Sequence, residues 1–443
     1  MTNPPHDFPS PTHWAVSRWG ADPYSRGSWS YVRPGGSPDD RAVLAEPISD
    51  GVILAGEAVH RTRPAMVHGA YETGRAAADW CGDASSVIIV GAGAAGIGAA
   101  EVLGDRCVVV EARDRIGGRI DTVMLGDAAA DLGAAWMQQY GDNAVAERVR
   151  AMDIASVPTD FARPIVRARI DDDAVIVHEN YQALKAACAA FIRAEAGGDG
   201  WDGSVPLDPG PWLASLAPAE RAAAMRMIEG DIVIEAGAPT TDISSKWVFS
   251  EPGVGEGDRW LPSGYGDVMS RLVAGIDVRL GWPVTHIEHG GDIGEGVVVR
   301  GPSGSLRADR AIVTVPISIL QADAITFQPS LPHRHRRALD RIGLGTVEKV
   351  VLRFAERWWP HDDNGYFRWF DEPTNFVEWL DLTDHVGAPV VAGLISAPHT
   401  LGWYNESSDF DIAMRATHAL HRCAGMFPSS QSSRSVGTDV SER

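Results

Sequence analysis

The pattern of apolar and polar positions predicts strands and helices in mixed order along the chain. Continuous apolar runs of the length typical of buried strands occupy residues 52–55, 87–90, 107–110 and 311–316. Residues 277–299 alternate between apolar and polar side chains, with Gly290 and Gly291 as turn residues. A helical period of apolar positions marks residues 66–78, 144–152, 181–196, 218–229 and 411–423. This order predicts an α/β fold in which a mixed α+β part interrupts a sheet-rich part.

The strongest local signal is the sequence GAGAAG at residues 91–96, between an apolar strand and an Ala-rich helix. Gly91 permits a tight turn, Gly93 lets the backbone approach a pyrophosphate, and Gly96 lets helix and strand pack closely. The phosphates then lie at the positive end of the helix dipole. The next strand ends in Glu111, at the spacing expected for a ribose-binding acid. A carboxylate there repels a 2′-phosphate, which favours FAD or NAD over NADP.

The residues after this acid distinguish between the two remaining cofactors. Arg113 follows at once, and Gly117, Gly118 and Arg119 come shortly after it, so that an arginine can make a charge-assisted contact with a pyrophosphate. Together with DLGAAW at residues 131–136, this stretch resembles the FAD-binding module of the flavin amine oxidase family. The resemblance, and not the spacing alone, selects FAD.

The segments of this resemblance come in an unusual order. Residues 51–74, GVILAGEAVHRTRPAMVHGAYETG, resemble the closing stretch of the family. They nevertheless precede the nucleotide-binding fingerprint at residues 91–96. The chain therefore resembles a circularly permuted member of the family. Permutations succeed at exposed loops with neighbouring ends, and the last helix and first strand of the family belong to one domain.

The resemblance extends to residues 343–358, GLGTVEKVVLRFAERW, a run that carries a lysine near the flavin. Lys349 falls at that position, which implies a bond through water to the N5 edge of the flavin. A lysine buried beside the ring is expected to have a lowered pKa, which suits proton handling or oxygen activation. Val284 matches the valine whose backbone contacts the adenine.

Residues 18–31, RWGADPYSRGSWSY, resemble the segment that covers the flavin face in the polyamine oxidase and lysine demethylase branch. Trp29 stands where the family has a cage tyrosine, and an aromatic wall there would orient an amine and exclude water. Ser28 replaces the cysteine that links the flavin covalently in mammalian-type monoamine oxidases, so that the resemblance implies non-covalent FAD. Two departures weaken a specific substrate assignment: Met66 replaces the second cage tyrosine, and Gln138 replaces an acid or histidine.

The resemblance thus supplies three sets of candidate residues. The catalytic candidates are Lys349, Trp29 and Trp19, and the substrate-pocket candidates are Trp29, Met66, Gln138 and Tyr24. The candidates for contact with FAD are Gly91, Gly93, Ala95, Gly96, Glu111, Ala112, Arg113, Gly118, Arg119, Gly133, Ala134, Ala135, Trp136, Val284, Gly56, Glu57, Met66 and Val67. His333 and His335 are interpreted as the solvated start of a basic helix, and His68 as structural or at the edge of the pocket.

The implied activity is oxidative deamination of an amine, with hydride transfer to the flavin, imine hydrolysis, and reoxidation by oxygen to give hydrogen peroxide. A di- or polyamine is favoured, and a monoamine or an L-amino acid remains open. A flavin desaturase, a porphyrinogen-type oxidase and a non-catalytic flavoprotein subunit are the rival interpretations. A formal charge of −20 disfavours nucleic acid and suits a cationic substrate, although it also serves solubility.

Composition adds expectations about the setting of the protein. The four cysteines show no metal or disulfide spacing, and we expect a reducing, cytoplasmic compartment and no metal site. No signal peptide or membrane-spanning run is evident, and a homodimer stays an option. The expected parts are a FAD-binding domain at 12–152 (12–80 and 86–152) and 256–320, a substrate domain at 153–255 and 321–428, and a mobile tail at 429–443.

Overall fold

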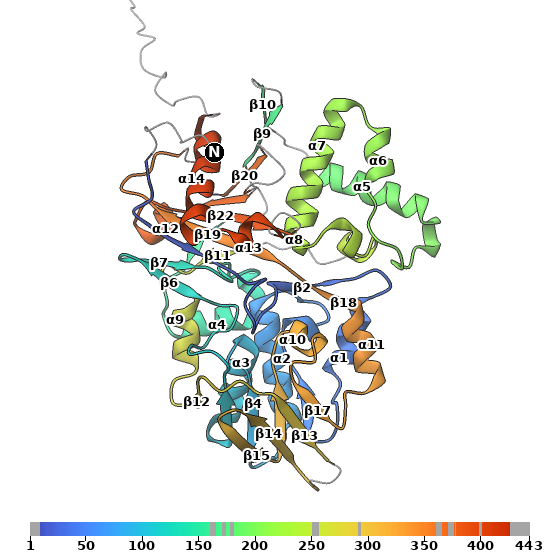
Figure 1. Ribbon diagram of the computed structural model, residues 1–443, viewed down its shortest axis with the longest axis vertical. Coiled ribbons are helices and arrows are strands. Elements are labelled where there is room, and N and C mark those ends of the chain that lie inside the picture. The colour runs from blue at the N-terminus through green and yellow to red at the C-terminus, as the bar shows by residue number, and fades with distance from the viewer. Residues whose placement is uncertain are drawn as a thin grey trace, which may run out of the picture.

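The computed structural model describes residues 9–159, 165–170, 174–177, 181–249, 257–290, 294–359, 366–370, 376, 378–397 and 401–425. These residues form two lobes, one above the other in Figure 1. The parallel-sheet lobe contains β4 and the helices packed on it, and the seven-strand lobe contains β19, β22 and α14. The tail expected at 429–443 lies outside the described residues.

The parallel-sheet lobe is built on five parallel strands in the order β12-β5-β4-β16-β3. Their bounds are Asp277–Arg279, Cys107–Val110, Val87–Val90, Arg310–Val313 and Val52–Leu54. The central strand β4 is buried at every position, because helices or loops cover both faces, and this explains its unbroken apolar run. Val52 pairs with Ala311, so residues 12–80, called the early segment below, contribute the edge strand of this sheet.

Small residues let two helices of this lobe approach each other closely. α2 (Val67–Trp80) packs on α3 (Ala94–Leu103). A Cβ atom at Gly74 would lie 1.8 Å from the carbonyl oxygen of Ala95, and one at Gly98 would lie 2.5 Å from that of Tyr71. The Ala- and Gly-rich composition of α3 therefore reflects a backbone-to-backbone contact, which brings the early segment against the fingerprint helix.

A seven-stranded sheet in the order β1-β19-β22-β21-β20-β9-β10 forms the core of the other lobe. β19 (Val347–Arg353) and β22 (Val390–Ser396) lie side by side and are almost wholly buried. Side chains alternate between the two faces: Val350 joins the cluster under α14 (Asp409–Gly425), whereas Val351 joins the cluster on the helical side. By this alternation Lys349 points to the helical side of the sheet.

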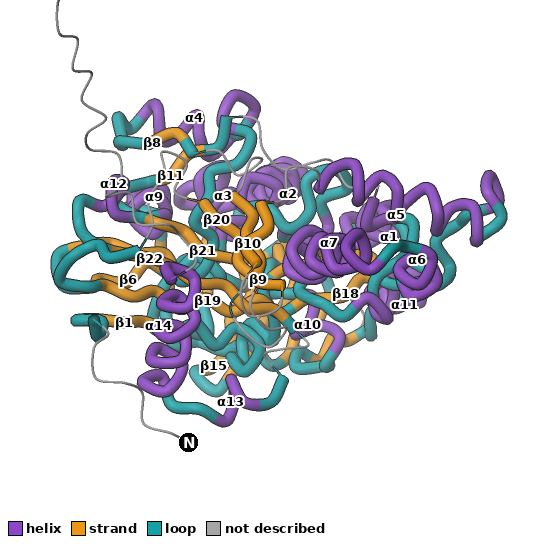
Figure 2. Tube along the Cα trace, turned by 90° about the horizontal axis from the view of Figure 1, so that it is seen from above, coloured by secondary structure: helices purple, strands orange, loops and turns teal. Residues whose placement is uncertain are grey.

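The helical side is covered by an arm that projects to one side of the sheet in Figure 2. The arm contains α5 (Tyr181–Glu195), α6 (Gly210–Ser215) and α7 (Pro218–Ile228). α7 continues through a π-helical turn, η5 (Glu229–Val233), into the short α8 (Ile234–Ala236).

The remaining helices and strands connect or flank these sheets. The helices are α1 (Pro38–Ala45), α4 (Ala144–Ala151), α9 (Tyr265–Leu272), α10 (Ile317–Gln321), α11 (His333–Arg341), α12 (Thr383–Val386) and α13 (Trp403–Glu406). The strands are β1 (His13–Val16), β2 (Trp29–Val32), β6 (Thr122–Leu125), β7 (Ala128–Asp131), β8 (Val157–Pro158), β9 (Ile165–Ile170), β10 (Ala174–Val177), β11 (Arg259–Trp260), β13 (His286–His289), β14 (Val297–Gly301), β15 (Gly304–Ala308), β17 (Thr326–Gln328), β18 (Ile342–Gly345), β20 (Tyr366–Phe370) and β21 (Glu378–Asp381).

The predicted helices and strands form close to their expected bounds, but the structure differs from three of our expectations. The interpretation of His335 as solvated is wrong: α11 exists, but His335 is fully buried and its ring nitrogen Nε2 lies 3.0 Å from the carbonyl oxygen of Glu46. The strand expected at 311–316 ends at Val313. β1, expected within the cofactor part, pairs with β19 in the seven-stranded sheet. Within the described residues, no helix is both long and apolar enough to cross a membrane.

Candidate functional site

A cavity of about 1120 Å³ lies between the two lobes. The early segment, the fingerprint region, β19 and the helical arm all contribute to its wall. Every candidate residue from the sequence lines this cavity except Gly96. Gly96 lies behind the wall, where a Cβ atom would meet the carbonyl oxygen of Gly91 at 1.9 Å, which is the close helix-strand packing that we expected of it.

One end of the cavity has the features of a dinucleotide site. Gly91 adopts a φ of 109°, and a Cβ atom at Gly93 would meet only the carbonyl oxygen of Gly117, at 3.9 Å. The open side of Gly93 therefore leaves room for a phosphate beside the first turn of α3. Glu111 is buried at the end of β5 and accepts hydrogen bonds from the backbone N–H groups of Ala92, at 2.8 Å, and Arg113, at 2.9 Å. These bonds hold an acceptor at the cavity, where ribose hydroxyl groups can donate to it.

The residues present fit a flavin dinucleotide. The cavity exceeds the volume of about 300–1,000 Å³ that is usual for small-molecule sites, so that a cofactor and a substrate fit together. Its wall combines an acid for ribose, open glycine backbone at a helix N-terminus, and Val284.

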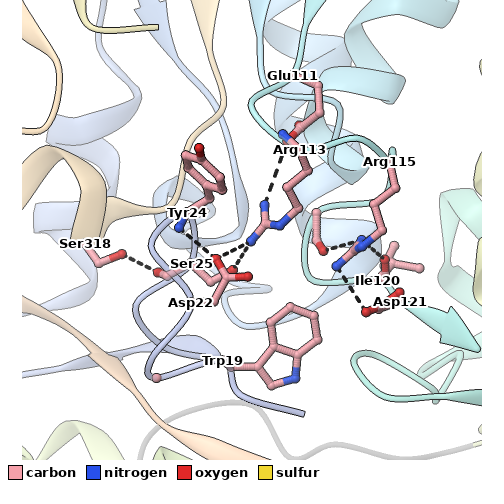
Figure 3. Close-up of polar contacts among 12 residues, drawn as sticks. Trp19, Asp22, Tyr24, Ser25, Glu111, Arg113, Arg115, Ile120, Asp121 and Ser318 are labelled. Atoms are coloured by element: carbon pink, nitrogen blue, oxygen red, sulfur yellow. Dashed lines mark hydrogen bonds and ion pairs between the residues drawn. The ribbon is translucent and has the colours of Figure 1, made fainter. Parts of the chain in front are cut away.

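Arg113 links the early segment to the fingerprint region, as Figure 3 shows. Its guanidinium donates to Asp22 Oδ1 at 2.8 Å and to Ser25 Oγ at 2.7 Å, and it lies 5.6 Å from the centre of the Tyr24 ring. These contacts with Asp22, Ser25 and Tyr24 fix the orientation of the guanidinium at the cavity wall.

Arg119 is held in a similar way by Glu57. Arg119 Nη1 donates to Glu57 Oε1 at 2.9 Å and to the carbonyl oxygen of Ser28 at 2.8 Å. Burial acts to raise the pKa of Glu57, but the charges of Arg119 and Arg41 and a hydrogen bond from Ser30 outweigh it and leave the pKa lowered. Glu57 is therefore ionised and serves to position Arg119.

Arg41 is a residue of this region that the sequence analysis missed. Its side chain is only 1% exposed, and its guanidinium donates to Ser30 Oγ at 2.6 Å and to the carbonyl oxygen of Ala58 at 3.0 Å. A single arginine in the polar helix α1 resembles an ordinary surface residue, so that only the tertiary structure reveals it.

Lys349 is a buried residue of the cavity wall. Its Nζ donates to the carbonyl oxygens of Asp131, at 2.9 Å, and Gly133, at 2.7 Å, and lies 5.7 Å from the centre of the Trp136 ring. Burial lowers the pKa of Lys349 to about 8, although the carboxylates of Asp131 and Glu378 act to raise it. A neutral amine has two N–H bonds, which the two carbonyls satisfy, so that its lone pair is left for the cavity.

Asp131 is a buried carboxyl group beside this lysine. It accepts hydrogen bonds from the backbone N–H of Tyr265 at the start of α9 and from the hydroxyl of Thr122. Burial raises the pKa of Asp131 to about 6, while Thr122, Lys349 and Tyr265 act to lower it. Asp131 thus caps α9 and also shares an electrostatic interaction with Lys349.

Indole rings line the part of the cavity near Lys349. Trp29 Nε1 donates to the carbonyl oxygen of Glu235 at 2.6 Å, and Trp19 Nε1 donates to that of Leu132 at 3.3 Å. Trp136 packs against Trp260 with ring centres 4.9 Å apart. Because carbonyl groups fix both indole N–H groups, the rings form a wall of defined orientation.

Three carboxylates on this wall were absent from the predicted site: Asp231, Glu235 and Glu378. Lys349 on β19 and Glu378 on β21 both pair with Leu394 on β22. The side chains of Lys349, Leu394 and Glu378 therefore form a row on one face of the sheet. A glutamate in a strand or a helix carries no local signal of its own, because only the sheet register and the arm bring these residues to the cavity.

Comparisons with known proteins agree with this geometry. The sequence matches the family described as flavin containing amine oxidoreductase over residues 4–81 and 94–441. It is 28% identical to probable polyamine oxidase 4 of Arabidopsis thaliana, over 69% of this chain and 65% of that protein. It is 29% identical to lysine-specific histone demethylase 1 homolog 1 of Oryza sativa subsp. japonica, over 62% of this chain and 35% of that protein. The chain spans 60–65% of the length of the first curated polyamine oxidases that it matches.

Solved structures show the same fold. A putrescine oxidase with bound putrescine aligns with a TM-score of 0.58 and 21% identity over 77% of this chain and 81% of that one. Cyclohexylamine oxidase from Brevibacterium oxydans IH-35A aligns with a TM-score of 0.59 and 22% identity over 75% of this chain and 80% of that one. The predicted α/β fold is confirmed.

Proposed function

The chain belongs to the flavin-containing amine oxidoreductase family, and from this membership we propose that it oxidises an amine, with a di- or polyamine favoured as substrate. The observation that carries the proposal is Lys349: its pKa is lowered to about 8, and both N–H bonds of its neutral form are satisfied at a cavity that also contains the nucleotide fingerprint.

We propose FAD as the flavin, held without a covalent bond. Glu111 would accept from the ribose, the first turn of α3 would face the pyrophosphate, and Val284 would contact the adenine. Ser28 Oγ donates to the carbonyl oxygen of Val347 at 2.7 Å, so that this hydroxyl is committed to the protein. When bound, the flavin supplies the two-electron acceptor for oxidation at the carbon next to nitrogen, and oxygen is the proposed final acceptor.

Lys349 would then remove the proton that blocks the reaction. An alkylamine is protonated at neutral pH and must lose a proton before the C–N bond is oxidised. Neutral Lys349 presents its lone pair to the cavity and can accept this proton, and the indoles of Trp29 and Trp136 favour the neutral substrate by excluding water. Trp19, Tyr24, Met66 and Gln138 complete the proposed pocket.

The charge of the pocket favours a substrate with more than one amino group. Three carboxylates line the wall near the indoles, so that a second, protonated nitrogen gains an interaction that a monoamine lacks. An L-amino acid would bring a carboxylate to the same acidic surroundings, which makes it a poorer candidate.

We also propose that the chain is a circular permutant with the domain bounds expected above, except that β1 belongs to the seven-strand lobe. β3 and α2 precede the fingerprint yet complete its sheet and pack on its helix, and α14 packs against β1. The family match is interrupted at residues 82–93, where the permutation would join the two former ends. The buried thiols of Cys81, Cys107 and Cys188 suit the reducing cytoplasm proposed as the location.

The test is anaerobic mixing of the flavin-loaded protein with spermidine, putrescine, tyramine, cyclohexylamine and several amino acids. Flavin absorbance reports reduction, and peroxide is measured after air is readmitted. We expect the di- and polyamines to bleach the flavin fastest. If none of these amines bleaches it, the proposal fails, and a desaturase, a porphyrinogen-type oxidase or a non-catalytic flavoprotein becomes the better interpretation.

A further inference from the structure

The π-helical turn η5 brings two carboxylates to the cavity on the side of the helical arm. Such turns are rare and are frequently found at functional sites. Asp231 lies within the turn and is 5% exposed, and Glu235 follows one turn later, in α8. Both residues line the cavity.

An ammonium group from the protein already lies against this turn. Lys185 on α5 also lines the cavity, and its Nζ donates to the carbonyl oxygen of Asp231 at 3.4 Å and lies 3.8 Å from Glu235 Oε2. The side chains of Lys185 and Glu235 are 24% and 36% exposed. An ion pair this long and this exposed is weak, so that another ammonium group can replace it.

The turn is fixed relative to the indole wall. Trp29 donates to the carbonyl oxygen of Glu235, and the backbone N–H of Thr346 donates to that of Gly237 at 2.7 Å. Gly345 lies so close that a Cβ atom there would be 1.9 Å from the carbonyl oxygen of Ala236. A cation bound at the turn is therefore held at a set distance from the cavity centre.

We propose that Asp231 and Glu235 bind the protonated nitrogen of a di- or polyamine that is remote from the reacting nitrogen, and that Lys185 holds this position until the substrate displaces it. The inference rests on the proposed amine oxidation and adds the residues that select a dication. Glu378 is the less suitable residue for this role, because it lies in one row with Lys349 and interacts with the charge of that lysine.

Displacement of Lys185 by the substrate predicts the direction in which each substitution changes the affinity for a diamine. Lys185 competes with the substrate for the Glu235 carboxylate and for the carbonyl oxygen of Asp231, so its removal strengthens the binding of a diamine. Removal of the Glu235 charge weakens it. A monoamine of the same length has no second ammonium group and responds to neither change.

The experiment compares putrescine with n-butylamine in anaerobic flavin reduction by the loaded protein, which separates the half-saturating concentration from the limiting rate. Lys185→Met is expected to lower the half-saturating putrescine concentration about threefold to fivefold. Glu235→Gln is expected to raise it about tenfold or more. Lys185→Arg keeps the charge and should retain the wild-type value, and the limiting rates should stay within about twofold.

Three results would overturn the inference. The first is weaker putrescine binding in Lys185→Met, and the second is an equal shift for both amines in either variant. The third is a loss in limiting rate without a change in half-saturation. Lys185→Met alters a partly exposed side chain, so that the test stands even if Glu235→Gln folds poorly. If no amine reduces the flavin of the unaltered protein, the proposed function itself is wrong, and this inference falls with it.

Discussion

Replacement of Lys349 by methionine removes the one titratable group on which the proposed proton transfer depends. Methionine has a similar length and is apolar, so that it suits the buried site, whereas the hydrogen bonds to the carbonyls of Asp131 and Gly133 are lost. We expect FAD to stay bound, because the contacts proposed for the dinucleotide come from other residues.

The magnitude follows from the pKa of about 8 for Lys349. At pH 7 about one tenth of such a lysine is neutral, whereas an amine with a pKa near that of free lysine, about 10.4, is neutral in roughly one molecule of 2,500. Without Lys349 the reaction depends on this small neutral fraction. These two fractions differ by about 250-fold, and we expect flavin reduction at pH 7 to slow by about that factor, within the range usual for general base catalysis.

The assay is the rate of anaerobic flavin reduction by putrescine between pH 6 and 10. In the unaltered protein the rate should rise with an apparent pKa near 8, because Lys349 must lose its proton before it can accept another. In Lys349→Met this rise should be absent, and a rise set by the substrate should remain at higher pH. If the variant retains the rise near pH 8, or reduces its flavin at the normal rate, Lys349 is not the base.

Three further predictions concern residues around the site. Asp131→Asn should stabilise the protein more at pH 7.5 than at pH 4 in urea unfolding. The folded pKa of Asp131 is raised to about 6, so this carboxyl contributes stability below pH 4 that is lost as the pH rises through 6. Equal effects of the substitution at both pH values would contradict this. Gly74→Val should cost at least about 3 kcal/mol in the same assay, because its Cβ would overlap a backbone carbonyl of the next helix, whereas Gly141→Ala, with open space around it, should change stability little. Arg41→Leu removes a charge that keeps the pKa of Glu57 low, and we expect weaker FAD binding in equilibrium dialysis; unchanged binding would assign Arg41 to stability alone.

The sequence predicted the α/β fold and the glycine-rich wall of the cavity because these depend on local patterns. A strand followed by GAGAAG and an acid at a fixed spacing specify a turn whose geometry depends on glycine. The position of Lys349 was also predictable, since neighbouring valines mark β19 as buried.

The substrate side of the cavity depends on long-range packing, and the sequence did not reveal it. Glu378 reaches the cavity only through the register of three strands, and Asp231 only through a turn wound differently from the helix on either side of it. The buried positions of Arg41 and His335 likewise depend on carbonyl groups far away in the sequence that accept their hydrogen bonds.

The pairing of β1 with β19 has a consequence for how the protein forms in the cell. The Thr12 hydroxyl donates to the carbonyl oxygen of Arg353, which lies 341 residues further along the chain. At about 5–20 residues per second, a ribosome needs roughly 20 to 70 seconds to make the intervening residues. During this time β1 and the edge strand β3 have left the ribosome without the strands that complete their hydrogen bonds, and such unpaired edges favour aggregation. The strands β1 and β3 are thus synthesised long before their partners and are among the last to find their place, and chaperones that shield nascent chains should raise the yield of folded protein.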